Sequence, residues 1–197
     1  MKDSDFEESD EILVSRSKNG DKEAFDILVQ RYRQPLFRFI YHSIRQKDDA
    51  EDITQEAFVK AYLSLHQLKD DHLFKIWLFK IGLNLIRDSK RLAKRRKIAS
   101  LDSLMENQEA QPESDDSSSE EGAEKQEIYQ RLEKEISALP QELREVIVLR
   151  DIQGFSYEEI AFMLHCPLGT VKSRLFQARK ILREKLSDIL GDDVYEL

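Results

Sequence analysis

Between residues 172 and 183, side chains able to bind DNA recur at spacings that place them on one side of a helix. Lysine and arginine pair with backbone phosphates, whereas serine and glutamine hydrogen-bond the edges of bases, and an exposed ring can lie against a thymine methyl group. The set is Lys172, Ser173, Phe176, Gln177, Lys180 and Arg183. A solvated face on a bundle helix is the alternative, but an outward Phe176 beside cations favours binding to duplex DNA.

A second row of candidate residues, between residues 77 and 91, suits single-stranded DNA. Aromatic rings stack on unpaired bases, amides hydrogen-bond their Watson–Crick edges, and cations hold the backbone. The row consists of Trp77, Lys80, Asn84, Arg87 and Arg91. The preceding polar segment QLKDDHL predicts a loop that could wall a pocket. For Trp77, a place in the hydrophobic core is an equal alternative.

A helix-turn-helix must position the first set. Ser156 and Glu159 have the spacing of a capping box, which starts a helix. Pro167 and Gly169 predict a turn, because proline lacks an N–H and glycine tolerates positive φ, and Thr170 is the expected cap of the second helix. Apolar residues at helical spacing predict the buried sides of the two helices: Ile160, Ala161 and Leu164, then Val171, Leu175, Ala178 and Leu182.

Three amphipathic helices, over residues 21–44, 48–65 and 74–96, are predicted to position the second row. Pro35 is expected to bend the first helix. The outward face of the second helix is polar, and it is either merely solvated or a surface for a protein partner: Glu51, Asp52, Gln55, Glu56 and Lys60. The third helix has a predicted core stripe beside the DNA-binding row: Phe74, Leu78, Ile81, Leu85 and Leu92.

The net charge of −8 is divided unevenly along the 197 residues. Ten acidic residues and a single lysine lie between residues 102 and 127, whereas residues 87–97 form a dense basic block. The run QPESDDSSSEEG is too polar to form a packed core, so it predicts a flexible linker. The expected organisation is an acidic tail over 1–20, a helical domain over 21–99, a linker over 100–127 and a helix-turn-helix domain over 128–190.

Composition predicts an all-α fold of two small helical domains, and it excludes several classes of protein. No apolar run approaches the roughly 20 residues that span a bilayer, and the acidic N-terminus is unlike a secretory signal. A single cysteine, Cys166, excludes an internal disulfide and a cysteine-cluster metal site, and it fits a reducing cytoplasm. Neither a GxxxxGKS/T phosphate loop nor an HExxH motif is present. We therefore expect no catalytic residue, cofactor or metal.

Two DNA-binding modules on a flexible tether suggest a promoter-opening protein, and the chain resembles bacterial sigma factors of the extracytoplasmic-function group. GDKEAFDILVQRYRQPLFRFIY resembles the opening helix of that family. DAEDITQEAFVKAY and FKIWLFKIGLNLIRDSKR resemble its polymerase-binding and promoter-melting segments in region 2. The stretch from Leu139 to Lys180 resembles its region 4. No single motif is decisive, but their order and spacing together are specific.

The resemblance implies a factor that binds core RNA polymerase and directs it to particular promoters, without a small-molecule substrate. It implies that Asp52, Gln55 and Glu56 contact the clamp of the largest polymerase subunit, and that the residue 172–183 set reads the −35 element. An anti-sigma protein is a further implied partner. For capture of the −10 strand, the resemblance adds loop residues to the Trp77 row: His66, Lys69, Asp70, Asp71 and His72.

This chain departs from the family where FQARK stands in place of a more basic motif, so the preferred −35 sequence does not transfer. The segment DDHLFKIW also lacks the family's usual glycine and serines before the tryptophan. The main alternative function is a dimeric helix-turn-helix regulator that binds operators. Such a regulator would bring a sensing domain with β-strands, and residues 21–97 predict none.

Overall fold

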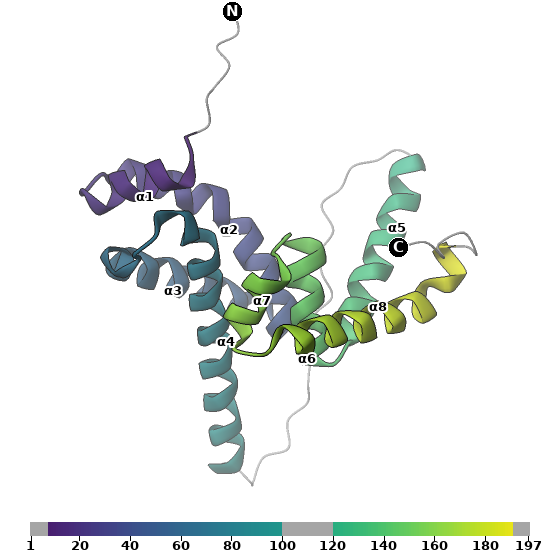
Figure 1. The fold of residues 1–197 in the computed structure, drawn as a ribbon. Helices are drawn as coiled ribbons and strands as arrows, with labels where there is room; N and C mark the ends of the chain where they lie inside the picture. The colour runs from purple at the N-terminus through teal and green to yellow at the C-terminus, as the bar shows by residue number, and fades with distance from the viewer. Residues whose placement is uncertain (1–7, 100–119, 191–197) are drawn as a thin grey trace, which may run out of the picture. The chain divides into compact units, whose positions relative to one another are not determined.

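The structure is a computed structural model that describes residues 8–99 and 120–190. All regular elements within these ranges are helical, which confirms the all-α prediction (Figure 1). The described helices form two compact units, α1–α4 and α5–α8, and each is considered separately below.

The first unit begins with α1 (Asp10–Lys18), which lies in the segment expected to be a tail. Leu13 and Val14 are completely buried, and the carboxylate of Asp10 accepts hydrogen bonds from Arg31 and Tyr32. The structure therefore differs from the expectation for this segment. Its sequence is mostly polar, with only three adjacent apolar residues, so tertiary packing rather than periodicity defines the helix.

Helix α2 (Lys22–Ile44) is the long helix expected from the sequence. Its N-terminus is capped by Asp21, which accepts a hydrogen bond from the amide of Ala24 at 3.2 Å. The apolar side packs against α1, α3 and α4, and Leu28, Leu36 and Ile40 are fully buried. Pro35 lies inside the helix.

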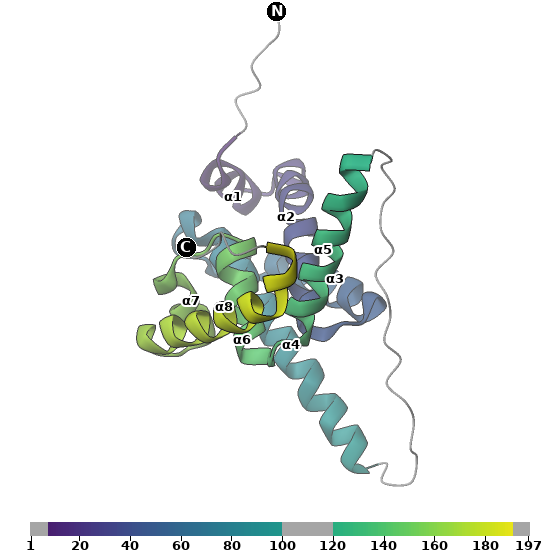
Figure 2. The ribbon, with the colours of Figure 1, turned by 90° about the vertical axis from the view of Figure 1, so that its right-hand side faces the viewer.

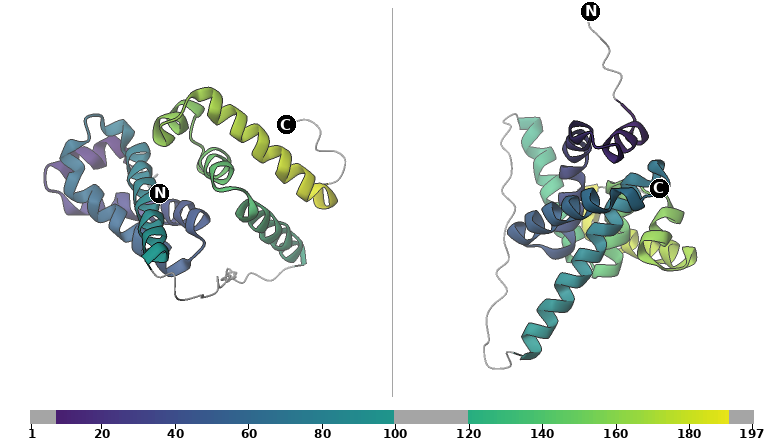
Figure 3. Two further views of the ribbon diagram at one scale, coloured as in Figure 1. Left: turned by 90° about the horizontal axis from the view of Figure 1, so that it is seen from below. Right: turned by 90° about the vertical axis from the view of Figure 1, so that its left-hand side faces the viewer.

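Helices α3 (Lys47–Ser64) and α4 (Phe74–Ala99) complete the first unit, joined by the short 3₁₀ turns η1 (Leu65–Gln67) and η2 (Asp71–Leu73). The views in Figure 2 and Figure 3 show the C-terminal part of α4 extending beyond the other helices of its unit. Leu92 lies on this extension and is 52% exposed, so its predicted place in the core stripe is wrong. The helical period continues there, but it does not ensure burial.

In the second unit, α5 (Glu120–Ala138) starts inside the expected linker, whose residues 100–119 lie outside the described part of the chain. It is followed by α6 (Gln141–Ile147), one turn of π-helix η3 (Val148–Ile152), α7 (Tyr157–Leu164) and α8 (Leu168–Leu190). Fully buried residues from η3, α7 and α8 form the core of this unit: Leu149, Ile160, Val171 and Ala178.

The turn between α7 and α8 differs from the expectation in two details. The positive φ of 53° belongs to His165 rather than to Gly169, and the amides of His165 and Cys166 both bond the carbonyl of Ala161, which closes the end of α7. Helix α8 begins at Leu168, directly after Pro167, so Thr170 lies in its first turn rather than capping it.

Candidate nucleic-acid interface

Helix α8 presents all six predicted duplex-binding residues to solvent. Its buried side carries Val171, Leu175 and Ala178, so the helix is fixed by one face only. The opposite side carries the exposed residues Lys172, Ser173, Phe176, Gln177, Lys180 and Arg183. Phe176 is 71% exposed, so its ring is accessible to a partner surface.

Two other arginines of α8 are held by ion pairs within the unit. Arg174 pairs with Glu142 at 2.5 Å, and Arg179 forms two hydrogen bonds to Asp151 at 2.7 and 3.2 Å. The hydrogen bond from Arg179 to Asp151 raises the pKa of the guanidinium. Among the described residues, Lys172 and Arg183 have no such ion pair, so their charges remain available to phosphates.

The N-terminus of α7, which supports α8, has the predicted capping box. Ser156 Oγ accepts a hydrogen bond from the amide of Glu159 at 3.1 Å, and the Glu159 carboxylate accepts from the amide of Ser156 at 2.6 Å. Arg150 reinforces this corner by donating to the carbonyl of Phe155 at 2.9 Å and lying 4.9 Å from the centre of the Tyr157 ring. The helix-turn-helix is therefore braced by contacts that leave the outward face of α8 unused.

The row predicted for single-stranded DNA runs along α4 with graded exposure. Trp77 is half-buried, and the centre of its ring lies 6.3 Å from that of Phe74. The side chain therefore packs partly in the core and remains partly accessible. Lys80 is also half-buried, whereas Asn84, Arg87 and Arg91 are exposed.

The polar loop before α4 is held by α1, a contact that the sequence analysis missed. Lys18 donates to the carbonyl of Leu68 at 2.6 Å and forms an ion pair with Asp71. The Glu11 carboxylate lies 2.6 Å from Nδ1 of His72. The pKa of Glu11 is lowered, mainly by a hydrogen bond from Ser9 and to a smaller degree by His72. In the sequence, the one sign of this contact is Lys18, a basic residue at the end of α1.

Four predicted loop residues meet in one surface hollow with side chains from α1. The loop contributes Lys69, Asp70, Asp71 and His72, and α1 contributes Glu11, Ile12, Ser15, Arg16 and Lys18. Neither His66 nor Asn84 lines this hollow, although both are exposed. Asp70 accepts a hydrogen bond from the amide of His72 at 3.1 Å and so caps η2.

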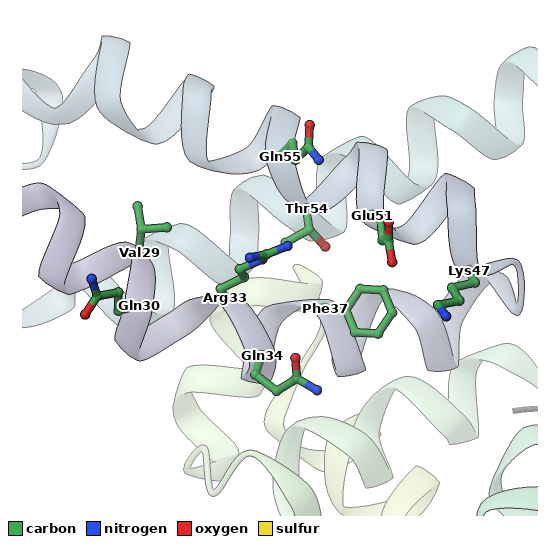
Figure 4. A pocket seen from close by; sticks show the side chains of 9 residues that line it. All are labelled: Val29, Gln30, Arg33, Gln34, Phe37, Lys47, Glu51, Thr54 and Gln55. Atoms are coloured by element: carbon green, nitrogen blue, oxygen red, sulfur yellow. The ribbon is translucent and has the colours of Figure 1, made fainter. Parts of the chain in front are cut away.

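The residues of α3 predicted to bind polymerase, Asp52, Gln55 and Glu56, are all exposed, and Gln55 lines a groove between α2 and α3. Gln55 and Glu51 of α3 and Arg33 and Phe37 of α2 are among the residues that line this groove (Figure 4). Asp52 and Glu56 lie outside its lining, and Glu56 pairs with Lys60 at 2.9 Å. The groove carries Glu51 and Lys47 from α3 and Arg33 from α2.

Within residues 8–99 and 120–190, no group of three or more histidine, cysteine or acidic side chains could hold a metal ion. Cys166 is a free, half-buried thiol in the α7–α8 turn. None of the described helices combines the length and the hydropathy needed to cross a bilayer.

Comparisons with known proteins assign both units to one family. The family described as Sigma-70 region 2 matches residues 28–96, and Sigma-70, region 4 matches residues 129–182. The chain is 35% identical to the RNA polymerase sigma-H factor of Pseudomonas aeruginosa over 94% of this chain and 98% of that protein. It is also 35% identical to the ECF RNA polymerase sigma-E factor of Escherichia coli K12, over 92% and 96%.

Solved structures give the same result. The sigma factor RpoE from Bartonella quintana, in complex with the anti-sigma factor NepR, has a TM-score of 0.68 and 28% identity, over 83% of this chain and 96% of that one. CnrH, in complex with the cytosolic domain of CnrY, has a TM-score of 0.64 and 28% identity, over 92% and 99%.

The two matched regions, in this order and over nearly the full length of these relatives, define a bacterial sigma factor with regions 2 and 4. The chain belongs to the extracytoplasmic-function group of sigma factors. It is a transcription initiation factor that binds core RNA polymerase and directs it to specific promoters, with region 2 acting at the −10 element and region 4 at the −35 element. The family and the function predicted from the sequence are confirmed, and an operator-binding regulator is not favoured. Members of this family are transcription factors rather than enzymes.

Proposed function

We propose that the outward face of α8 makes the −35 contacts. Lys172 and Arg183 bind phosphates, and Ser173, Phe176 and Gln177 face the bases in the major groove. The observation that carries this assignment is the contrast within one helix. Arg174 and Arg179 reach acidic partners on other elements of the unit, whereas the six predicted residues are all exposed, and the one ion pair that they form among the described residues joins Lys180 to Glu184 of the same helix at 4.0 Å.

The row on α4 captures the separated strand of the −10 element. Asn84 hydrogen-bonds an unpaired base, Arg87 and Arg91 hold the backbone, and the accessible side of Trp77 stacks against a base or closes the edge of the duplex. Exposure of Asn84 and Arg87 supports this role, and Lys80 adds positive charge to the row. The hollow beside η2 accepts a base that has left the stack.

The acidic face of α3 binds the clamp of the largest polymerase subunit. Asp52, Gln55 and Glu56 project into solvent from a helix whose other side is packed in the core, so they offer a rigid row of oxygen acceptors. The chain acts in the cytoplasm beside polymerase and promoter. Polymerase supplies the catalysis, so no cofactor, metal or small-molecule substrate is needed.

An anti-sigma protein regulates the factor by covering these surfaces. RpoE and CnrH, the two similar solved proteins, are in complexes with NepR and with the cytosolic domain of CnrY. Val59, Tyr62 and Leu63 form an exposed apolar strip on α3, which suits a protein partner. Purification of the endogenous protein from unstressed cells without any bound partner would contradict this regulation.

Promoter opening by holoenzyme that carries Asn84→Ala tests the assignment on α4. We expect permanganate reactivity of −10 thymines to fall at least about tenfold, because an oriented hydrogen bond to an extruded base is lost, while polymerase affinity is unchanged. Asp26→Ala, at an exposed position on α2, is the matched control. Equal loss of opening and polymerase binding would assign Asn84 to folding instead.

A further inference from the structure

Helix α1 contacts the polar loop before α4 through one face. Glu11 and Lys18 are seven residues apart, which places both on the same side of the helix with about 10 Å between them along the axis. Lys18 contacts the Leu68 carbonyl and the Asp71 carboxylate, and Glu11 contacts His72. Figure 1 shows α1 beside the turn that joins α3 to α4. The loop is therefore held from outside at two points.

The two contacts differ in strength. The side chains of Lys18 and Asp71 are only 24% and 26% exposed, and Lys18 also donates a hydrogen bond to the backbone carbonyl of Leu68. His72 is 74% exposed, so its contact with Glu11 is screened by solvent and is worth little. Lys18 is thus the main link between α1 and the loop.

The loop has few other restraints between its apolar ends. Leu68 and Phe74 are buried, but the side chains of residues 69–73 include no buried one. The cap made by Asp70 fixes only the η2 turn. The Lys18 amine joins Leu68 at the start of this exposed segment to Asp71 in its middle, so it sets the curvature of the loop.

Helix α1 is a firm support because other residues fix it to α2. Leu13 and Val14 are fully buried, and Asp10 accepts hydrogen bonds from Arg31 and Tyr32. Loss of the Lys18 contact should therefore release the loop and leave the helix in place.

We propose that Lys18 is a positioning residue that shapes the pocket for the extruded −10 base and so determines which base is accepted. This rests on the proposed role of the loop and of α4 in strand capture. Lys18 acts through Asp71 and the Leu68 carbonyl; together they hold one wall of the hollow that α1 shares with the loop. A loosened wall accepts bases less selectively and holds each one less well.

The test compares full-length wild-type protein with Lys18→Met, each bound to bacterial core RNA polymerase. The DNA is a set of promoters that differ by single-base changes across the −10 element. We expect Lys18→Met to open the preferred promoter about tenfold less well and to discriminate less among the single-base changes, with polymerase affinity and melting temperature unchanged. Lys22→Met, at an exposed position on α2, is the matched control, and it is expected to stay within about twofold of wild type.

Rescue by a conservative change tests the positioning role. Lys18→Arg keeps a cation that can donate to both Asp71 and the Leu68 carbonyl, so it should recover most of the base preference that Lys18→Met removes. Unchanged preference in Lys18→Met, or no recovery in Lys18→Arg, would overturn the inference. Failure of the wild-type holoenzyme to open any promoter would instead overturn the proposed function, so the two failures are distinguishable.

Discussion

The double variant Lys172→Ala with Arg183→Ala tests the duplex-binding face of α8. Each of these exposed cations is assigned one phosphate contact, and neither has an ion pair among the described residues. Every phosphate contact contributes about 0.9 to the slope of log affinity against log salt. Loss of both contacts should therefore lower the magnitude of the slope by about 1.8.

The expected change is large enough to measure. Between about 50 and 200 mM salt, the ratio of wild-type to variant affinity should fall about twelvefold, because a fourfold rise in salt acts on a slope difference of about 1.8. The assay is binding of the holoenzyme to a fluorescent promoter fragment across this range. Polymerase contributes its own salt dependence equally to both proteins, so the difference isolates α8.

Lys185→Ala is the matched control. Lys185 is exposed on the same helix but on a different side from Lys172. A slope unchanged by the double variant would refute the assigned contacts. A slope change half as large in Lys185→Ala, which removes one charge instead of two, would show that only the overall charge of the helix matters.

Four further changes test other parts of the structure. Gln55→Ala should weaken binding to core polymerase without altering the melting temperature, and equal binding in a competition assay would contradict the role of α3. Ser156→Ala should destabilise the second unit by about 1 kcal/mol in denaturant unfolding, because the capping box is lost. Leu149→Ala should destabilise it by about 2–5 kcal/mol, since the side chain is fully buried. Burial and the hydrogen bond to Asp10 raise the pKa of Tyr32, so the stability that this side chain contributes is complete below pH 10 and is lost as the pH rises further. In urea unfolding, the free energy of unfolding of Tyr32→Phe should therefore decline less above pH 10 than that of the wild type.

The sequence predicted the outward face of α8 correctly because that helix is amphipathic and its period fixes both sides at once. The capping box was equally readable, since Ser156 and Glu159 act locally. The same reasoning recognised α2, α3 and α4, whose apolar residues recur over several turns. Local patterns therefore sufficed to place the two rows of predicted DNA-binding residues on α4 and α8.

Tertiary contacts account for the features that the sequence did not reveal. Helix α1 depends on burial of Leu13 and Val14 and on bonds from α2 to Asp10, none of which has a periodic signal. The core stripe of α4 was extended to Leu92 because periodicity does not report where the neighbouring helices end. His165 takes the positive φ that Gly169 was expected to supply, because the end of α7 determines which residue must turn.

Reconstitution with core polymerase tests the central claim most directly. Purified protein is mixed with bacterial core RNA polymerase and genomic DNA fragments, and the 5′ ends of the transcripts are mapped. The account predicts a stable complex that opens promoters and starts transcripts at discrete sites, preceded by shared −10 and −35 sequences. Absence of polymerase binding, together with specific binding of duplex DNA by the protein alone, would contradict it.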